Sequence, residues 1–112
     1  MLKNNRGFTL IELVMVIVLL GILAAIAVPR FVDLQGEARL AVLDASVGAV
    51  RSSAVIQFAR TRSTNTFASI RGATDVDTNV LFTTPQCTNG LLTYSGSSDT
   101  RSFSISTSFC SG

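Results

Sequence analysis

Residues 8–28, FTLIELVMVIVLLGILAAIAV, decide the fold, because they are apolar apart from Thr9 and Glu12. From Leu13 to Val28, sixteen residues pass without one charge. As an α-helix rising about 1.5 Å per residue, the stretch spans roughly 30 Å, the thickness of one bilayer core. It therefore predicts a helix long enough to cross a membrane.

The rest of the composition excludes several function classes. The chain has 112 residues, of which 47% are hydrophobic and 14% charged, against about 25% charged in typical soluble domains. It contains no His and no Trp, which excludes a His-based catalytic triad and a His-ligated metal site. The net charge of +2 comes from Lys3 and Arg6, since residues 8–112 hold seven Arg and seven acids. We therefore expect no enzymatic centre, no cofactor and no nucleic-acid partner.

Three interpretations of the N-terminal segment compete. It is a secretory signal peptide cut after Ala27, where Ala25-Ile-Ala27 offers a small-residue cleavage site, or a plain transmembrane anchor, or a segment that leaves the membrane to pack in a protein assembly. Glu12 favours the third, because a carboxylate at the bilayer centre costs about 2.5–3.5 kcal/mol. A signal peptide or a simple anchor gains nothing from that charge.

A positive partner would offset the cost of Glu12. If the chain is cut after Gly7, the new ammonium of Phe8 lies about one helical turn from Glu12, where the helix dipole also favours an anion. In an oligomer the carboxylate could reach the N-terminus of a neighbouring subunit. The sequence thus predicts that Glu12 and Phe8 act together in assembly.

The run Arg6-Gly7-Phe8-Thr9-Leu10-Ile11-Glu12-Leu13 resembles the processing signal of type IV prepilins and their pseudopilin relatives. It has a basic leader, a Gly before the cut, a Phe after it and a Glu at the fifth mature position. The resemblance implies an α+β pilin fold, with one long N-terminal α-helix packed on a small antiparallel β-sheet head. It also implies cleavage between Gly7 and Phe8 by a prepilin peptidase, and N-methylation of Phe8 by the same enzyme.

The block Pro29-Arg30-Phe31-Val32-Asp33-Leu34-Gln35, followed by Ala38-Arg39, is similar to pilins of the mannose-sensitive haemagglutinin type. The resemblance implies a structural subunit of a helical homopolymer. Such a subunit sits in the bacterial inner membrane until an assembly platform adds it to an extracellular pilus. The alternative is a pseudopilin of a type II secretion system, and the remote one is a secreted binding module released after Ala27.

Four segments are expected: a cleaved leader at 1–7, a membrane or filament-core helix at 8–28, an amphipathic continuation at 29–62 and a head at 63–112. The continuation shows one apolar stripe with helical spacing. Pro29 removes a helical hydrogen bond and Gly21 weakens the helix. The resemblance implies melting between these two residues during assembly; a continuous helix with a proline kink is the alternative. The stripe comprises Leu40, Leu43, Val47, Val50, Ala54 and Phe58.

The head is predicted to hold short strands near 67–70, 79–84, 91–94 and 102–109. One register places Tyr94 opposite Phe103 and Cys87 opposite Cys110. A rival register makes Asn89-Gly90 a tight hairpin turn. A disulfide between the two cysteines is favoured in either case, because a small exported head needs such a cross-link.

Two weaker patterns involve charged residues of the head. Asp75, Asp77 and Asn79 match the first positions of a calcium loop but lack its Gly and its closing Glu, so a solvated turn is favoured over a metal site. Four arginines, with Asp75 and Asp77 nearby, are more typical of subunit contacts than of a nucleic-acid track. These arginines are Arg51, Arg60, Arg62 and Arg71.

Overall fold

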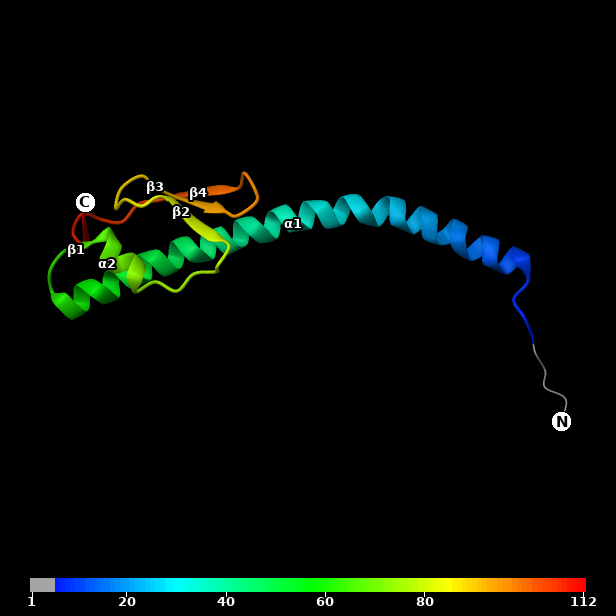
Figure 1. Cartoon of the computed structure of the whole chain (residues 1–112), viewed down its shortest axis with the longest axis horizontal. Coiled ribbons are helices and arrows are strands. Elements are labelled where there is room, and N and C mark those ends of the chain that lie inside the picture. The colour runs from blue at the N-terminus through cyan, green and yellow to red at the C-terminus, as the bar shows by residue number, and fades with distance from the viewer. Residues whose placement is uncertain (1–5) are drawn as a thin grey trace, which may run out of the picture. The chain divides into compact units, whose positions relative to one another are not determined.

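The structure, a computed structural model, describes residues 6–112, so most of the predicted leader lies outside the described residues. The chain divides into two units, Met1–Gln35 and Gly36–Gly112. Helix α1, Leu10–Thr61, contributes its first half to one unit and its second half to the other (Figure 1). The predicted helix is confirmed to within two residues at each end.

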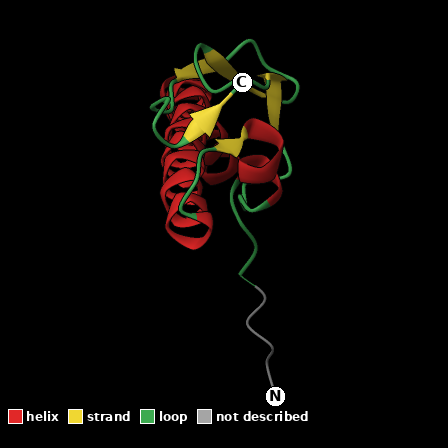
Figure 2. Ribbon diagram, turned by 90° about the vertical axis from the view of Figure 1, so that its left-hand side faces the viewer, coloured by secondary structure: helices red, strands yellow, loops and turns green. Residues whose placement is uncertain are grey.

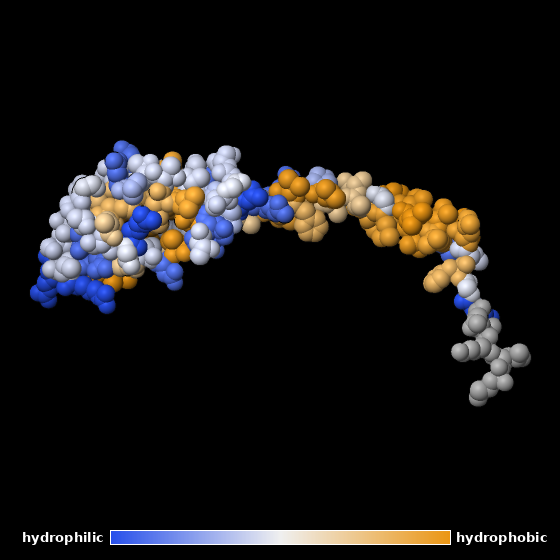
Figure 3. All heavy atoms as spheres, in the orientation of Figure 1, coloured by the Kyte–Doolittle hydropathy of each residue, from blue (hydrophilic) through white to orange (hydrophobic). Residues whose placement is uncertain are grey.

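The first unit is the apolar part of α1. The large hydrophobic side chains among its described residues are exposed, and Figure 3 shows hydrophobic surface along most of this part of the helix. By length and composition, α1 is the helix among the described residues that could cross a membrane. Residues 21–29 are helical, and Pro29 lies inside α1. Melting of this segment during assembly stays a prediction.

The second half of α1 provides one wall of the hydrophobic core. Leu43, Val50 and Ala54 are completely buried, while Leu40 and Phe58 at the two ends of the stripe are half-buried. The helical spacing of the stripe predicted this face, because residues three and four apart share one side of a helix. The rest of the core comes from the head: Phe67, Ile70, Val80, Cys87, Leu92, Phe103, Ile105 and Cys110.

The head contains an antiparallel sheet, which confirms the predicted α+β class. Strands β2 (Val80–Thr84), β3 (Gly90–Tyr94) and β4 (Thr100–Phe103) lie in that order (Figures 1 and 2). A second, parallel pair joins β1 (Asn65–Thr66) to β5 (Cys110–Ser111). This pair was not predicted.

Both predicted hairpin registers are wrong. Phe103 lies opposite Gly90, and Tyr94 pairs with Val80 of β2. The ring of Phe103 covers Gly90, where any Cβ would overlap it, so only glycine leaves room for this pairing. Gly90 thus begins β3, and Asn89, with its positive φ of 57°, ends the connection from β2 instead of forming a two-residue turn.

Two predicted strands also differ from the structure. The segment near 67–70 forms the short helix α2, Phe67–Gly72, because the Thr66 hydroxyl accepts a hydrogen bond from the Ser69 amide and caps the helix. The strand predicted at 102–109 ends at Phe103. Residues 106–109 form a turn, closed by the Phe109 amide bonding to the Ser106 carbonyl at 2.9 Å.

Replacing Gly90 with Ala is expected to destabilise the head by about 1–3 kcal/mol, the usual cost of overpacking a core. The added methyl group forces the Phe103 ring away from Phe67, on which it now stacks at 5.7 Å. Thermal unfolding of the full chain in detergent measures the loss. Gly72→Ala is the matched control, because a Cβ there meets no atom within 4 Å. Equal unfolding temperatures for the two variants would contradict this packing argument.

Candidate functional site

The candidate site is the start of α1. The Thr9 amide donates a hydrogen bond to Glu12 Oε2 at 2.8 Å, and the Thr9 hydroxyl donates to the same oxygen at 2.9 Å. The Glu12 amide in turn donates to the Thr9 hydroxyl oxygen at 3.3 Å. This reciprocal pattern is a capping box, which satisfies amide groups that the first helical turn leaves free.

The capping box gives Glu12 a role that we did not predict from the sequence. The expected partners of its carboxylate were the Phe8 ammonium and the helix dipole, with no side chain of its own helix. The T-x-x-E spacing of Thr9 and Glu12 was the available signal for a cap. Hydrogen bonds from Thr9 also reduce the cost of placing the carboxylate at the edge of an apolar segment.

The predicted cleavage point lies just outside the helix. Residues 6–9 are not helical, and Phe8 is 93% exposed. A Cβ placed on Gly7 would meet no atom within 4 Å. Packing within the described chain therefore does not explain a glycine at this position, whereas a narrow pocket in a processing enzyme would.

The predicted disulfide is present between Cys87 and Cys110, whose Cα atoms are 5.7 Å apart. Cys87 lies in the connection between β2 and β3, and Cys110 lies in β5, so the bond does not cross the predicted hairpin. Two backbone hydrogen bonds hold Cys87 in place: its amide donates to the Gly112 carbonyl, and the Ile105 amide donates to the Cys87 carbonyl. The disulfide thus fastens the last residues to the sheet.

The calcium candidates form a capped turn. Asp77 Oδ1 accepts hydrogen bonds from the Asn79 backbone amide at 2.8 Å and from its side-chain amide at 2.9 Å. Across residues 6–112, no three acidic, Cys or His side chains gather in a way that could hold a metal ion. The geometry fits the solvated turn that the sequence favoured.

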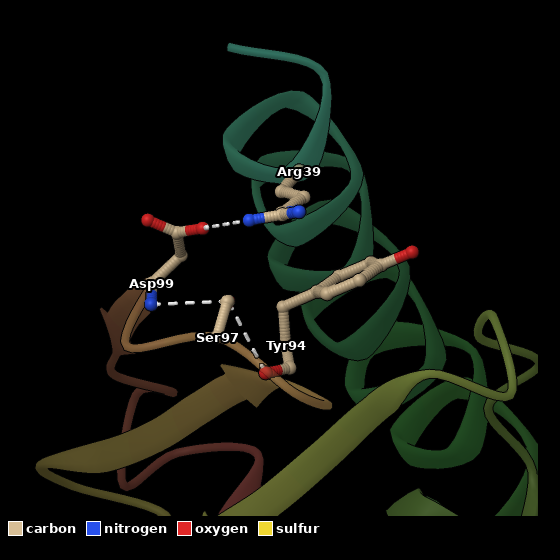
Figure 4. A network of polar contacts seen from close by, with 4 residues as sticks. All are labelled: Arg39, Tyr94, Ser97 and Asp99. Carbon is tan, nitrogen blue, oxygen red and sulfur yellow. Dashed lines mark hydrogen bonds and ion pairs between the residues drawn. The ribbon is translucent and has the colours of Figure 1, made fainter. Parts of the chain in front are cut away.

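Two ion pairs connect α1 with the β3–β4 hairpin. Figure 4 shows Arg39 of α1 reaching Asp99 at 3.7 Å, with its guanidinium 6.0 Å from the centre of the Tyr94 ring. Arg101 Nε donates to Asp44 Oδ1 at 2.7 Å, and this bond raises the pKa of Arg101. Exposed pairs of this kind stabilise a fold by about 0–1 kcal/mol, so their main effect is to orient the hairpin.

Known proteins with similar sequences match this chain in its N-terminal part, where the capping box and the apolar helix lie. Residues 2–28 match the prokaryotic N-terminal methylation motif. The type IV narrow pilus major component PilA5 of Thermus thermophilus is 63% identical over 51 residues, which are 46% of this chain and 44% of that protein. The type II secretion system core protein G of Pseudomonas aeruginosa is 37% identical over 51 residues, 46% of this chain and 36% of the relative.

A fimbrial protein of Neisseria meningitidis is 38% identical over 78 residues, covering 64% of this chain and 44% of that protein. These matches span less than half the length of each relative. No solved structure matches the chain. The methylation motif, the long apolar helix and these relatives together support a type IV prepilin, related to the pseudopilins of type II secretion.

Proposed function

We propose that the mature chain is a structural subunit of a type IV pilus. The observation that carries this proposal is the N-terminus, where a methylation motif includes the start of an apolar helix that no other part of the described chain covers. An uncovered helix of this length needs either lipid or other copies of itself around it. A pilus subunit has both environments: lipid while it is in the membrane, and the helices of other copies once it is in the filament.

Maturation begins with cleavage of the Gly7–Phe8 bond by a prepilin peptidase, followed by methylation of the Phe8 amine. The exposure of Phe8 and the non-helical backbone of residues 6–9 support access by such an enzyme. Cleavage removes Lys3 and Arg6 and creates a positive charge next to Thr9, the cap of α1. The mature N-terminus then carries a cation beside the capping carboxylate of Glu12.

Assembly exchanges lipid contacts for contacts between apolar helices. This exchange is close to neutral in free energy, because lipid tails are as apolar as leucine side chains. Register must then come from polar groups. Pairing of Glu12 with the Phe8 ammonium of a neighbouring subunit supplies it, since a misaligned helix leaves both charges without partners. An inner-membrane platform drives the transfer.

A second candidate function, a pseudopilin of a type II secretion system, is favoured by the similarity to core protein G. A pseudopilin shares the processing signal and the apolar helix. The two functions differ in where the mature chain accumulates. A pilin leaves the cell surface with sheared filaments, whereas a pseudopilin stays in the membrane fraction.

The test is the intact mass and N-terminal sequence of the chain from the sheared surface fraction of the native organism. We expect a chain that starts at methylated Phe8 and has both thiols oxidised. Mature chain confined to the membrane fraction would favour the pseudopilin. A soluble chain starting at Val28 would contradict both functions and leave a secreted module.

The variant Gly7→Val is expected to stop maturation without disturbing the fold, because a side chain at Gly7 meets nothing within the described chain. Mass spectrometry of the membrane fraction should find the chain with residues 1–7 still attached. Gly36→Val is the matched control, since a Cβ at Gly36 also meets no atom within 4 Å. Normal processing of Gly7→Val would refute the proposed cleavage site.

A further inference from the structure

The charged side chains of residues 36–112 fall into two groups, those that pair within the described chain and those that do not. Four of them form the ion pairs Arg39–Asp99 and Arg101–Asp44. The second group is Glu37, Arg51, Arg60, Arg62, Arg71, Asp75 and Asp77. Within the described chain, Asp75 and Asp77 at one place and Arg60 and Arg62 at another take part in no ion pair. An acidic pair and a basic pair therefore remain available for a partner. Figure 3 shows strongly hydrophilic side chains at the end of the head where α1 ends.

Arg62 occupies a position that normally favours glycine. It follows the last residue of α1 with a φ of 53°, and its amide closes the helix by bonding to the Phe58 carbonyl at 2.7 Å. Glycine adopts this left-handed conformation without strain, whereas other L-residues do not. Its side chain is exposed, so packing does not explain the arginine. Strain kept at one residue points to a role for its side chain.

The acidic pair borders a groove beside α1. The groove has a volume of about 260 Å³ and is lined by small or apolar side chains of α1, with the 75–77 loop along its other side. Apolar walls suit the methylene groups of an arginine, and carboxylates at the edge suit its guanidinium. The lining residues are Val42, Ala45, Ser46, Ala49, Asp75, Val76 and Asp77.

The arginines cannot reach the groove of their own chain. Arg60 lies eleven residues beyond Ala49 on the same helix, which is about 16 Å along its axis. Arg60 or Arg62 can therefore enter such a groove only on another molecule. Two different surfaces of one chain that bind each other join copies head to tail. Such contacts build open helical polymers when the rotation between copies does not close a ring.

We propose that Arg62, assisted by Arg60, inserts into the groove bordered by Asp75 and Asp77 on a second copy of this chain. This contact between heads rests on the proposed pilin function. In the filament, apolar helices contact one another in the core. The proposed contact adds a polar interaction outside the core, and this interaction sets the spacing of the heads. Arginine suits this task better than lysine, because its planar guanidinium binds a carboxylate through two parallel hydrogen bonds.

The test reverses the charges of Arg62 and Asp75, first singly and then together. The variants are made in the full chain and expressed in cells that assemble filaments from the native chain. We expect Arg62→Glu and Asp75→Arg each to lower the amount of sheared filament about tenfold, as for the loss of a charge-assisted pair. The double variant Arg62→Glu/Asp75→Arg should restore it to within about twofold. Asp75 is chosen because Asp77 caps the turn through Asn79.

Two further variants separate the contact from folding and from net charge. Arg62→Gly relieves the backbone strain, so it should keep the head folded and still lower filament yield about tenfold. Glu37→Arg changes the net charge by the same amount as Asp75→Arg, at an exposed residue of α1 that does not line this groove, and it should assemble normally. Native yield from Arg62→Gly, no rescue by the double variant, or an equal loss in Glu37→Arg would overturn the proposal. Absence of filaments from the native chain itself would instead refute the pilin function.

Discussion

Replacing Glu12 with Val is expected to leave the subunit processed and inserted in the membrane and to remove it almost completely from extracellular filaments. The valine makes membrane residence more favourable, because the carboxylate no longer has to be accommodated near an apolar core. The same change removes the carboxylate that we propose pairs with the Phe8 ammonium of the neighbour. Quantifying the chain in membrane and sheared fractions measures both effects.

The capping box demands controls that separate the cap from the charge. Glu12→Gln keeps an oxygen that can accept the hydrogen bonds of Thr9, but it has no charge. Thr9→Ala keeps the charge and removes the hydroxyl that now bonds Glu12. If charge pairing sets the register, Gln fails as Val does, and Thr9→Ala still assembles. The reverse result would assign the role of Glu12 to the cap, and normal filaments from Glu12→Val would refute both.

Removing the disulfide is expected to destabilise the head by about 3 kcal/mol. Cys87 and Cys110 are 23 residues apart, and closing a loop of this size restricts the unfolded chain by about that amount. For a unit of this size, about 3 kcal/mol corresponds to an unfolding temperature lower by about 15 °C. Thermal unfolding of Cys87→Ser/Cys110→Ser in detergent, monitored by near-ultraviolet circular dichroism, checks the value.

Without the disulfide, unfolding should begin in the C-terminal segment that contains β5. β5 pairs with β1 through only two residues, and Phe109 contacts Phe58 of α1 at 5.2 Å between ring centres. Native chain treated with a reductant is the matched control and should unfold at the same temperature as the double variant. If reduction leaves the unfolding temperature unchanged, the hydrogen bonds and apolar contacts of this segment are sufficient to hold it in place, and the predicted stabilisation by the disulfide is wrong.

Sequence periodicity predicted the parts of the fold that depend on one face of one element. The stripe from Leu40 to Phe58 became the helical wall of the core, and the strands at 80–84 and 90–94 lie within two residues of their expected bounds. The stripe has the 3.6-residue spacing of a buried helix face. The two strands are short runs of apolar residues, Val80-Leu81-Phe82 and Leu91-Leu92, without strict alternation. The predicted disulfide between Cys87 and Cys110 also forms, although the strands do not have either of the predicted registers.

Periodicity could not determine how the strands pair. The observed partner of Phe103 is Gly90, four residues from the predicted partner Tyr94. A shift by an even number of residues keeps every side chain on its original face, so alternation gives no preference between the two registers. The deciding factor is the space above Gly90 that the Phe103 ring fills.

Two local signals for helix caps were present in the sequence and were not used. Thr66 and Ser69 have the spacing that starts α2, where a strand was expected. Thr9 and Glu12 have the spacing of a capping box at the start of α1. In both cases a side-chain oxygen satisfies amide groups within one turn. Such contacts are short in sequence and can be predicted from spacing alone.

Because the first half of α1 is uncovered, the concentration of subunits available for assembly has to be measured in the membrane and not in solution. Exposing sixteen consecutive uncharged residues, Leu13 to Val28, to water costs on the order of tens of kcal/mol, at roughly 1.5–3 kcal/mol for each large apolar side chain. A free aqueous monomer is therefore negligible as a precursor. For the proposed pilus subunit, the quantity that governs filament growth is then the number of subunits per unit area of membrane. Filament length should respond to this surface density and not to bulk concentration.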